Sequence, residues 1–156
     1  MSVVHPIARE PFSYRLDPAV PDFDDSGPVV FMDGDCALCS LGARVIARLD
    51  RRGEFRICPI KTDLGAAILA HYGLAPRDPA TWLYLEDGKA HGSLDAMIAV
   101  GRRTGGVGRL LAPLRLLPLG LRNWLYRRIA LNRYALFGRA RLCELPDPGL
   151  RARLLR

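Results

Sequence analysis

The hydrophobic pattern divides the first two-thirds of the chain into alternating strands and helices. The apolar run "PVVFMDG" (28–34) ends in Asp-Gly and is typical of a buried strand. Residues 40–53 carry apolar side chains at helical spacing and a terminal glycine, which predicts a helix with its arginines on the other side. The apolar positions of this helix are Leu41, Val45, Ile46 and Leu49. "EFRICPI" (54–60) is a second strand, so the two strands should run parallel with a right-handed crossover.

The pattern then continues through a helix, a hairpin and a further helix. Residues 62–73 predict a helix that ends at a glycine, and 80–92 predict a β-hairpin around Asp-Gly. Residues 93–103 predict a helix with Ser93 as its N-cap. The order βαβ, α, ββα is that of a thioredoxin-like α/β domain.

Three parts are expected. Residues 1–27 hold four prolines and an acidic cluster, and they predict an extended N-terminal arm. Residues 28–104 form the thioredoxin-like core. Residues 105–156 predict a helical basic extension packed on that core, which Pro113 and Pro118 divide into two or three short helices.

Charge is unevenly distributed along the chain, whose net charge is +7. Acids outnumber bases seven to two in 1–35, whereas 96–143 hold ten arginines and no acid. The arm could therefore lie across the basic half. The leucines and arginines of the extension could contact an anionic membrane or a nucleic acid, but packing of the leucines on the core is favoured over both. No nucleic-acid partner is expected, and peripheral membrane contact is not favoured.

Composition fits a single globular domain: the chain has 156 residues, of which 49% are hydrophobic. Neither a signal peptide nor an apolar run long enough to span a membrane is recognised. Four unevenly spaced cysteines do not suggest a disulfide scaffold. The expectation is a cytoplasmic protein with reduced thiols.

The candidate chemistry lies at Cys36 and Cys39, in the loop between the first strand and the first helix. Positive potential at the helix start is expected to lower the pKa of Cys36, which makes it the nucleophile in disulfide exchange. The two-residue spacing lets Cys39 act as the resolving thiol. Such a dithiol needs a disulfide-bearing protein or small-thiol substrate and an external electron donor, but no bound cofactor and no metal.

An alternative is a zinc-binding or membrane-surface interaction module with Cys36, Cys39 and Cys58 as ligands. Zinc sites usually contain a second close pair of ligands, and here the other cysteines and histidines stand singly. Cys58 ends the second strand. It could be a third redox thiol or a ligand, but burial is the favoured interpretation. Cys143 is assigned no role.

Two carboxylates flank the pair. Asp35 is expected to cap the helix, while Asp33 supports the turn with Gly34. A functional hypothesis is that Asp33 relays a proton for Cys39.

Two motifs resemble one known family. "FMDGDCALCSLGARVI" (31–46) resembles the signature of the DCC thiol–disulfide oxidoreductases, and "YRRIALNRYALFGRARLC" (126–143) resembles their second signature. The resemblance implies a thioredoxin-like fold and protein-disulfide reductase activity. It leaves open whether Arg133 and Tyr134 serve the redox site or only anchor their helix. Thioredoxins also carry a cis-proline facing the site, and Pro79 is the candidate for that role.

Overall fold

The protein is built around a four-stranded mixed sheet. A computed structural model describes residues 9–74, 82–145 and 147–155. The strand order is β2-β1-β3-β4; β1 and β2 are parallel, and the other neighbours are antiparallel. The strands are β1 (Val29–Met32), β2 (Arg56–Pro59), β3 (Leu83–Glu86) and β4 (Lys89–Gly92). The parallel pair and the hairpin are both as predicted.

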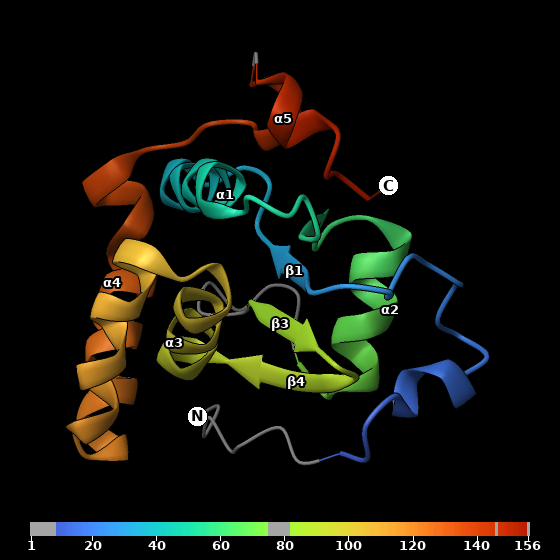
Figure 1. Cartoon of the computed structure of the whole chain (residues 1–156), viewed down its shortest axis with the longest axis horizontal. Coiled ribbons are helices and arrows are strands. Elements are labelled where there is room, and N and C mark those ends of the chain that lie inside the picture. Colours follow the sequence, from blue (N-terminus) through green and yellow to red (C-terminus); the bar gives the residue numbers. More distant parts are fainter. Residues whose placement is uncertain (1–8, 75–81, 146, 156) are drawn as a thin grey trace.

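Helices cover both faces of the sheet (Figure 1). The first three are α1 (Ala37–Leu49), α2 (Asp63–His71) and α3 (Ser93–Thr104). Every residue of β1 is buried because α1 and α3 pack on one face while α2 packs on the other. The sequence prediction of a thioredoxin-like α/β fold is confirmed.

Two details of the helices differ from the prediction. The buried side of α1 consists of Ser40, Ala43 and Ile46, whereas Leu41 is 53% exposed and Val45 is also exposed. Small residues on the inner side let the helix approach the sheet closely, which turns the larger leucine and valine outward. The N-cap of α3 is Gly92, so Ser93 is the first helical residue instead of the cap.

The arm packs against the core instead of lying across the basic half. It contains a 3₁₀ helix, η1 (Ser13–Leu16), in which Tyr14 is buried. The ring of Phe23 meets that of Phe31 of β1 edge-on, and the Ser13 hydroxyl and the Asp17 carboxylate are both hydrogen bonded to the His71 ring of α2. The expected placement of the arm across the basic half was wrong. Burial of its aromatic side chains against β1 and α2 determines where the arm lies, and its net charge does not.

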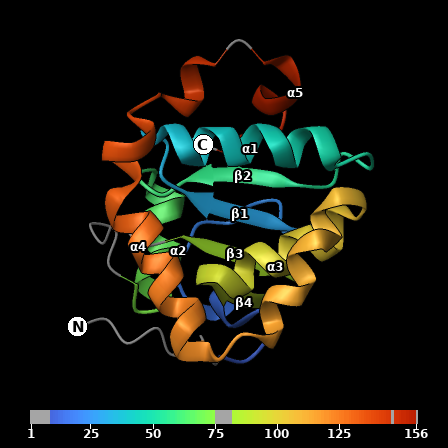
Figure 2. The same cartoon turned by 90° about the vertical axis from the view of Figure 1, so that its left-hand side faces the viewer.

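The C-terminal part also departs from expectation. Its elements are η2 (Gly106–Leu116), α4 (Leu119–Phe137), η3 (Leu142–Glu144) and α5 (Pro148–Arg151). Pro118 separates η2 from α4 as predicted, whereas Pro113 lies inside η2 and does not divide it. Helix α4 is long and contacts α1 and α3 along the outside of the molecule (Figure 2). No described residue of η2 is buried, and α4 buries Ala130 and Arg133. The leucines of the extension therefore pack on the core only in part: Leu142 and Leu150 are buried, whereas Leu110, Leu116 and Leu121 are exposed.

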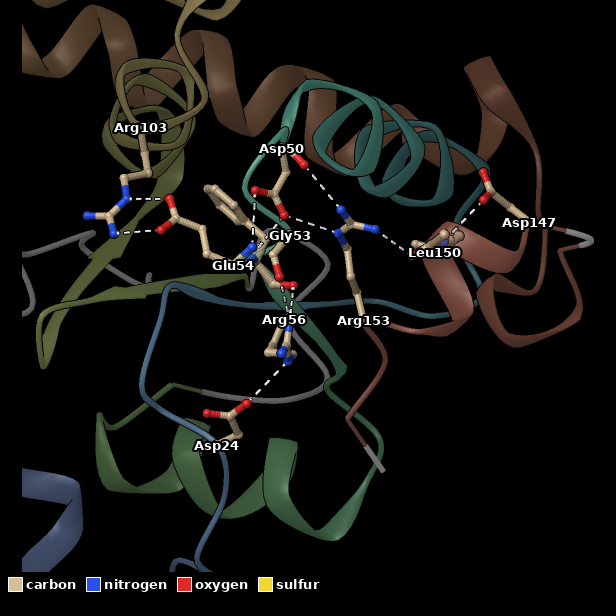
Figure 3. Close-up of polar contacts among 11 residues, drawn as sticks. Asp24, Asp50, Gly53, Glu54, Arg56, Arg103, Asp147, Leu150 and Arg153 are labelled. Atoms are coloured by element: carbon tan, nitrogen blue, oxygen red, sulfur yellow. Dashed lines mark hydrogen bonds and ion pairs between the residues drawn. The ribbon is translucent and has the colours of Figure 1, made fainter.

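The last residues close the free edge of β2. Leu154 forms a parallel bridge with Ile57, and Arg153 binds Asp50 at the end of α1 with an Nε–Oδ2 distance of 3.1 Å. Figure 3 shows this pair beside the bidentate ion pair between Arg103 and Glu54. These contacts fix the C-terminal end of α1, and its N-terminal end carries the candidate site. Within the described residues, no helix is long and apolar enough to cross a membrane.

Candidate active site

The two cysteines lie where β1 passes into α1. Cys36 is the N-cap of the helix, and its Sγ accepts a hydrogen bond from the Cys39 amide at 3.3 Å. Cys39 is the third residue of the helix. Amides at a helix start point toward the N-cap and carry partial positive charge, so negative charge on the Cys36 sulfur is stabilised. The sequence placed both residues correctly.

The environments of the two thiols differ strongly. Burial, a hydrogen bond to Cys36 and the negative charge of Cys36 together raise the pKa of Cys39 to about 12. The two sulfurs therefore lie within hydrogen-bonding reach, and Cys39 holds its proton at neutral pH. Cys36 itself is fully buried in the closed structure, whereas Cys39 is partly exposed. Of the two thiols, Cys36 is thus the less accessible to solvent.

An ion pair is buried beneath the thiols. The Arg133 guanidinium donates to Oδ2 of Asp33 at 2.8 Å, and both side chains are almost fully buried. The Tyr134 hydroxyl also donates to this carboxylate, and Oδ1 accepts the Asp35 amide at 2.9 Å. The second motif thus contacts the first directly. Arg133 and Tyr134 both bind the carboxylate of Asp33 and so connect α4 to the loop that carries the dithiol.

The charges of this cluster act in opposite directions on the thiols. Although burial disfavours the Asp33 carboxylate, hydrogen bonds from Tyr134 and the Asp35 amide, with the charge of Arg133, hold the pKa of Asp33 below its ordinary value. The positive charge of Arg133 lowers the pKa of Cys39, and the negative charge of Asp33 raises it. Burial disfavours the charged form of Arg133, but the Tyr134 hydroxyl and both thiols keep the pKa of Arg133 above its ordinary value. Asp33 therefore partly neutralises the Arg133 guanidinium, which also interacts electrostatically with the two cysteines.

Asp35 and Gly34 support the loop differently from expectation. Asp35 is not the helix cap, because Cys36 occupies that position; its carboxylate pairs with Lys61 after β2. A side chain at Gly34 would come within 3.3 Å of the Pro59 side chain, so this position favours glycine for space. Lys61 was not identified from the sequence, because Asp35 is 26 residues away and no local pattern connects the two.

The segment after α4 covers the nucleophile. We call residues 138–142 the strap. The Leu142 amide donates to the carbonyl of Gly34 at 2.7 Å, and the Ala140 amide donates to the carbonyl of Asp35 at 3.1 Å. Arg139 forms an antiparallel bridge with Cys36. The strap was missed, although Gly138, with a φ of 78°, is the kind of helix-ending residue that sends a chain back across its fold.

The remaining candidate residues do not join this cluster. Cys58 is buried against α2, where its Sγ lies 3.3 Å from the Thr62 hydroxyl, on the face of the sheet opposite that of Cys39. The three cysteines of the zinc alternative are thus not brought together. In the described ranges, no group of three or more His, Cys, Asp or Glu side chains could hold a metal ion. Pro79 and the side chain of Cys143 lie outside the described residues.

Fold and site together define a thioredoxin-like α/β protein with a CxxC pair at the start of its first helix. A family model described as DCC1-like thiol-disulfide oxidoreductase matches residues 30–139, and the chain belongs to this family. The match extends from β1 to the start of the strap, so it includes the first motif, the greater part of the second and both residues of the Asp33–Arg133 contact.

Two curated proteins are similar to this chain over most of its length. It is 30% identical over 123 residues to the chloroplastic DCC family protein At1g52590 of Arabidopsis thaliana, which covers 78% of this chain and 72% of that protein. It is 31% identical over 127 residues to the uncharacterized protein YuxK of Bacillus subtilis strain 168, which covers 81% and 93% respectively. No solved structure matches.

Proposed function

We propose that this protein is a thiol–disulfide oxidoreductase that reduces disulfides with the Cys36–Cys39 pair. The observation that carries the proposal is the position of the Cys36 sulfur, which accepts the Cys39 amide at the start of α1 while Arg133 lies nearby. A sulfur in this position is stabilised as a thiolate, and the thiolate is the species that attacks a disulfide.

The proposed reaction has two exchange steps. The Cys36 thiolate attacks one sulfur of the substrate disulfide, so a Cys36–substrate bond forms and the first substrate thiolate leaves. Cys39 then loses its proton and attacks Cys36, which forms the Cys36–Cys39 disulfide and releases the second substrate thiolate. The substrate gains two electrons and two protons in all. An external dithiol donor restores the reduced pair by the same exchange in reverse.

The second step requires that Cys39 become acidic when Cys36 is no longer a thiolate. Burial, the hydrogen bond to Cys36 and the charge of Cys36 raise the pKa of Cys39 to about 12 in the free dithiol. Formation of the mixed disulfide removes that charge, whereas the positive charge of Arg133 persists. The proton of Cys39 can pass to the departing thiolate or to Asp33, and the relay through Asp33 stays a prediction.

The first measurement is a redox titration of the purified protein. Equilibration in glutathione or dithiothreitol buffers, with alkylation of free thiols and mass spectrometry, should give one reversible two-electron couple assigned to Cys36 and Cys39. The pair should be the only one that forms: Cys58 should remain alkylatable after unfolding at every potential. Absence of a Cys36–Cys39 disulfide at any potential contradicts the proposed function.

Access to Cys36 should be controlled by the strap. Leu142, which is buried, anchors the strap, so Leu142→Ala should lower the free energy needed to lift it from the Cys36 loop. A reduction of about 1.4 kcal/mol in that opening energy corresponds to a tenfold higher rate of reaction. We expect alkylation of Cys36 by iodoacetamide to accelerate roughly tenfold or more in the native protein.

Leu64→Ala is the matched control, because Leu64 is a similarly buried leucine of α2, on the opposite face of the sheet. This variant should lose global stability without faster labelling of Cys36. Peptide mapping separates the label on Cys36 from that on the other cysteines. Equal acceleration in both variants, or none in Leu142→Ala, contradicts control by the strap.

A further inference from the structure

The outward side of α4 presents large apolar side chains to solvent. Leu121, Trp124 and Leu131 are all exposed, and Trp124, the largest, is 54% exposed. Their spacing of three and seven residues places them on one side of the helix, away from the buried Ala130 and Arg133. Figure 2 shows α4 running along the outside of the molecule, with none of the described helices or strands over it. This apolar row has no use in packing the fold.

The preceding segment continues the same kind of surface. Leu110 and Leu116 of η2 are exposed, Leu116 to 89%. Leu119 at the start of α4 is exposed as well. Large exposed apolar side chains in this number on neighbouring segments indicate a binding surface. We define the η2–α4 surface by its exposed side chains, which are Leu110, Arg115, Leu116, Leu119, Leu121, Trp124, Arg128 and Leu131.

The charged side chains of this surface are all arginines, although Asp95 of α3 pairs with Arg122 of α4. Arg115 and Arg128 are exposed, and residues 96–143, which include the whole surface, hold ten arginines and no acid. The Arg128 guanidinium lies over the Trp124 ring, 5.4 Å from its centroid. A second copy placed face to face would oppose arginine to arginine, so the surface does not complement itself. The η2–α4 surface complements a partner that has negative charges on its outside and an apolar layer directly below them.

We propose that the η2–α4 surface docks the protein on an anionic lipid bilayer. Leucine side chains would enter the boundary between headgroups and acyl chains, Trp124 would lie at headgroup depth, and the arginines would bind lipid phosphates. The break at Pro118 does not oppose this, because two consecutive segments can each place apolar side chains in a bilayer without forming a continuous helix. The proposal is independent of the chemistry of the dithiol.

The test is co-sedimentation of the full chain with vesicles. We expect binding to vesicles of phosphatidylcholine with about 30% phosphatidylglycerol, and at least tenfold weaker binding to phosphatidylcholine alone. Binding should fall several-fold between 0.1 and 0.5 M NaCl, because salt screens the arginines. Trp124 fluorescence should shift to shorter wavelength on binding, and the shift should be lost in Trp124→Phe.

Matched variants separate this surface from general positive charge. Arg115→Gln with Arg128→Gln should weaken binding roughly tenfold, and Trp124→Ala should do the same. Arg9→Gln with Lys89→Gln removes the same charge from exposed positions elsewhere, and Leu16→Ala removes an exposed leucine of η1; both should bind as the wild type does.

Three results would overturn the proposal. The first is equal binding to anionic and neutral vesicles. The second is loss of binding in the control variants to the same extent as in the surface variants. The third is tight binding to single-stranded nucleic acid or to an acidic protein without any binding to vesicles. Circular dichroism of each variant excludes unfolding as the cause of a loss.

Discussion

Cys39→Ser is expected to accumulate mixed disulfides between Cys36 and its substrates, whereas Cys36→Ser should accumulate none. A serine hydroxyl is not an adequate nucleophile at neutral pH, so the variant performs the first exchange and stops. Turnover in both variants should fall by about 1,000-fold or more, because each removes one of two obligatory thiols. The measurement is non-reducing electrophoresis with mass mapping of the cross-linked peptide.

The trapping experiment has a built-in control in Cys58. Cys58 is buried on the far side of the sheet, so Cys39→Ser with Cys58→Ala should trap partners as well as Cys39→Ser alone. Trapping through Cys58, or equal trapping by Cys36→Ser, would show that the attacking sulfur was wrongly assigned. Failure to trap any disulfide, including that of a small model substrate, would remove the basis of the proposed function.

Arg133→Met is expected to destabilise the fold by about 3 kcal/mol or more. Asp33 and Arg133 are both almost fully buried and hydrogen bonded, so removal of the cation leaves a buried carboxylate without its countercharge. Arg128→Met, on the exposed side of the same helix, should change the free energy of unfolding by less than about 0.5 kcal/mol. Chemical denaturation of the reduced proteins measures both.

The same variant has a redox effect that a structural role alone does not predict. The positive charge of Arg133 favours negative charge on the reduced dithiol, since the guanidinium interacts with both cysteines. Without it the reduced form is less stable, so the midpoint potential of the couple should become more negative, by about 30 mV for each tenfold change in the equilibrium constant. A potential that does not move while stability falls would limit Arg133 to anchoring α4.

The stability effect of Arg133→Met should depend on pH in a defined direction. The folded-state pKa of Asp33 lies below its ordinary value of 3.8, so its contribution is present above that value and is lost as pH falls through the lower folded pKa. The difference in unfolding free energy between wild type and variant should thus be full at neutral pH and shrink below about pH 4. A difference that is constant down to pH 2 would show that Asp33 is not the partner involved.

Asp33→Asn with Arg133→Met provides the complementary variant. Because it removes both charges, its cost should be smaller than the sum of the two single substitutions. Asp33→Asn alone also tests the proton relay: an unchanged exchange rate and pH profile would end that hypothesis. Slower resolution with unchanged attack by Cys36 would support it.

The sequence by itself determined the features that follow from local periodicity and from residue chemistry. Alternation of apolar runs with helical spacing fixed the βαβ unit and the hairpin, because each pattern is satisfied within a few residues of the chain. The CxxC pair had to lie at a strand–helix junction for the same reason. Glycine at 34 and 138 marked two turns, although only the first was recognised as part of the site.

Only the tertiary structure decided which distant groups meet at that junction. Asp33 and Arg133 are 100 residues apart, and no local pattern states that a buried carboxylate after β1 will pair with a helix near the C-terminus. The strap likewise covers Cys36 through backbone hydrogen bonds, which any sequence can supply. The leucines of α4 stay exposed because α1, α2, α3 and the arm already cover the sheet. Periodicity indicates which side of a helix is apolar. Whether that side finds a surface to pack on depends on how the whole fold is assembled.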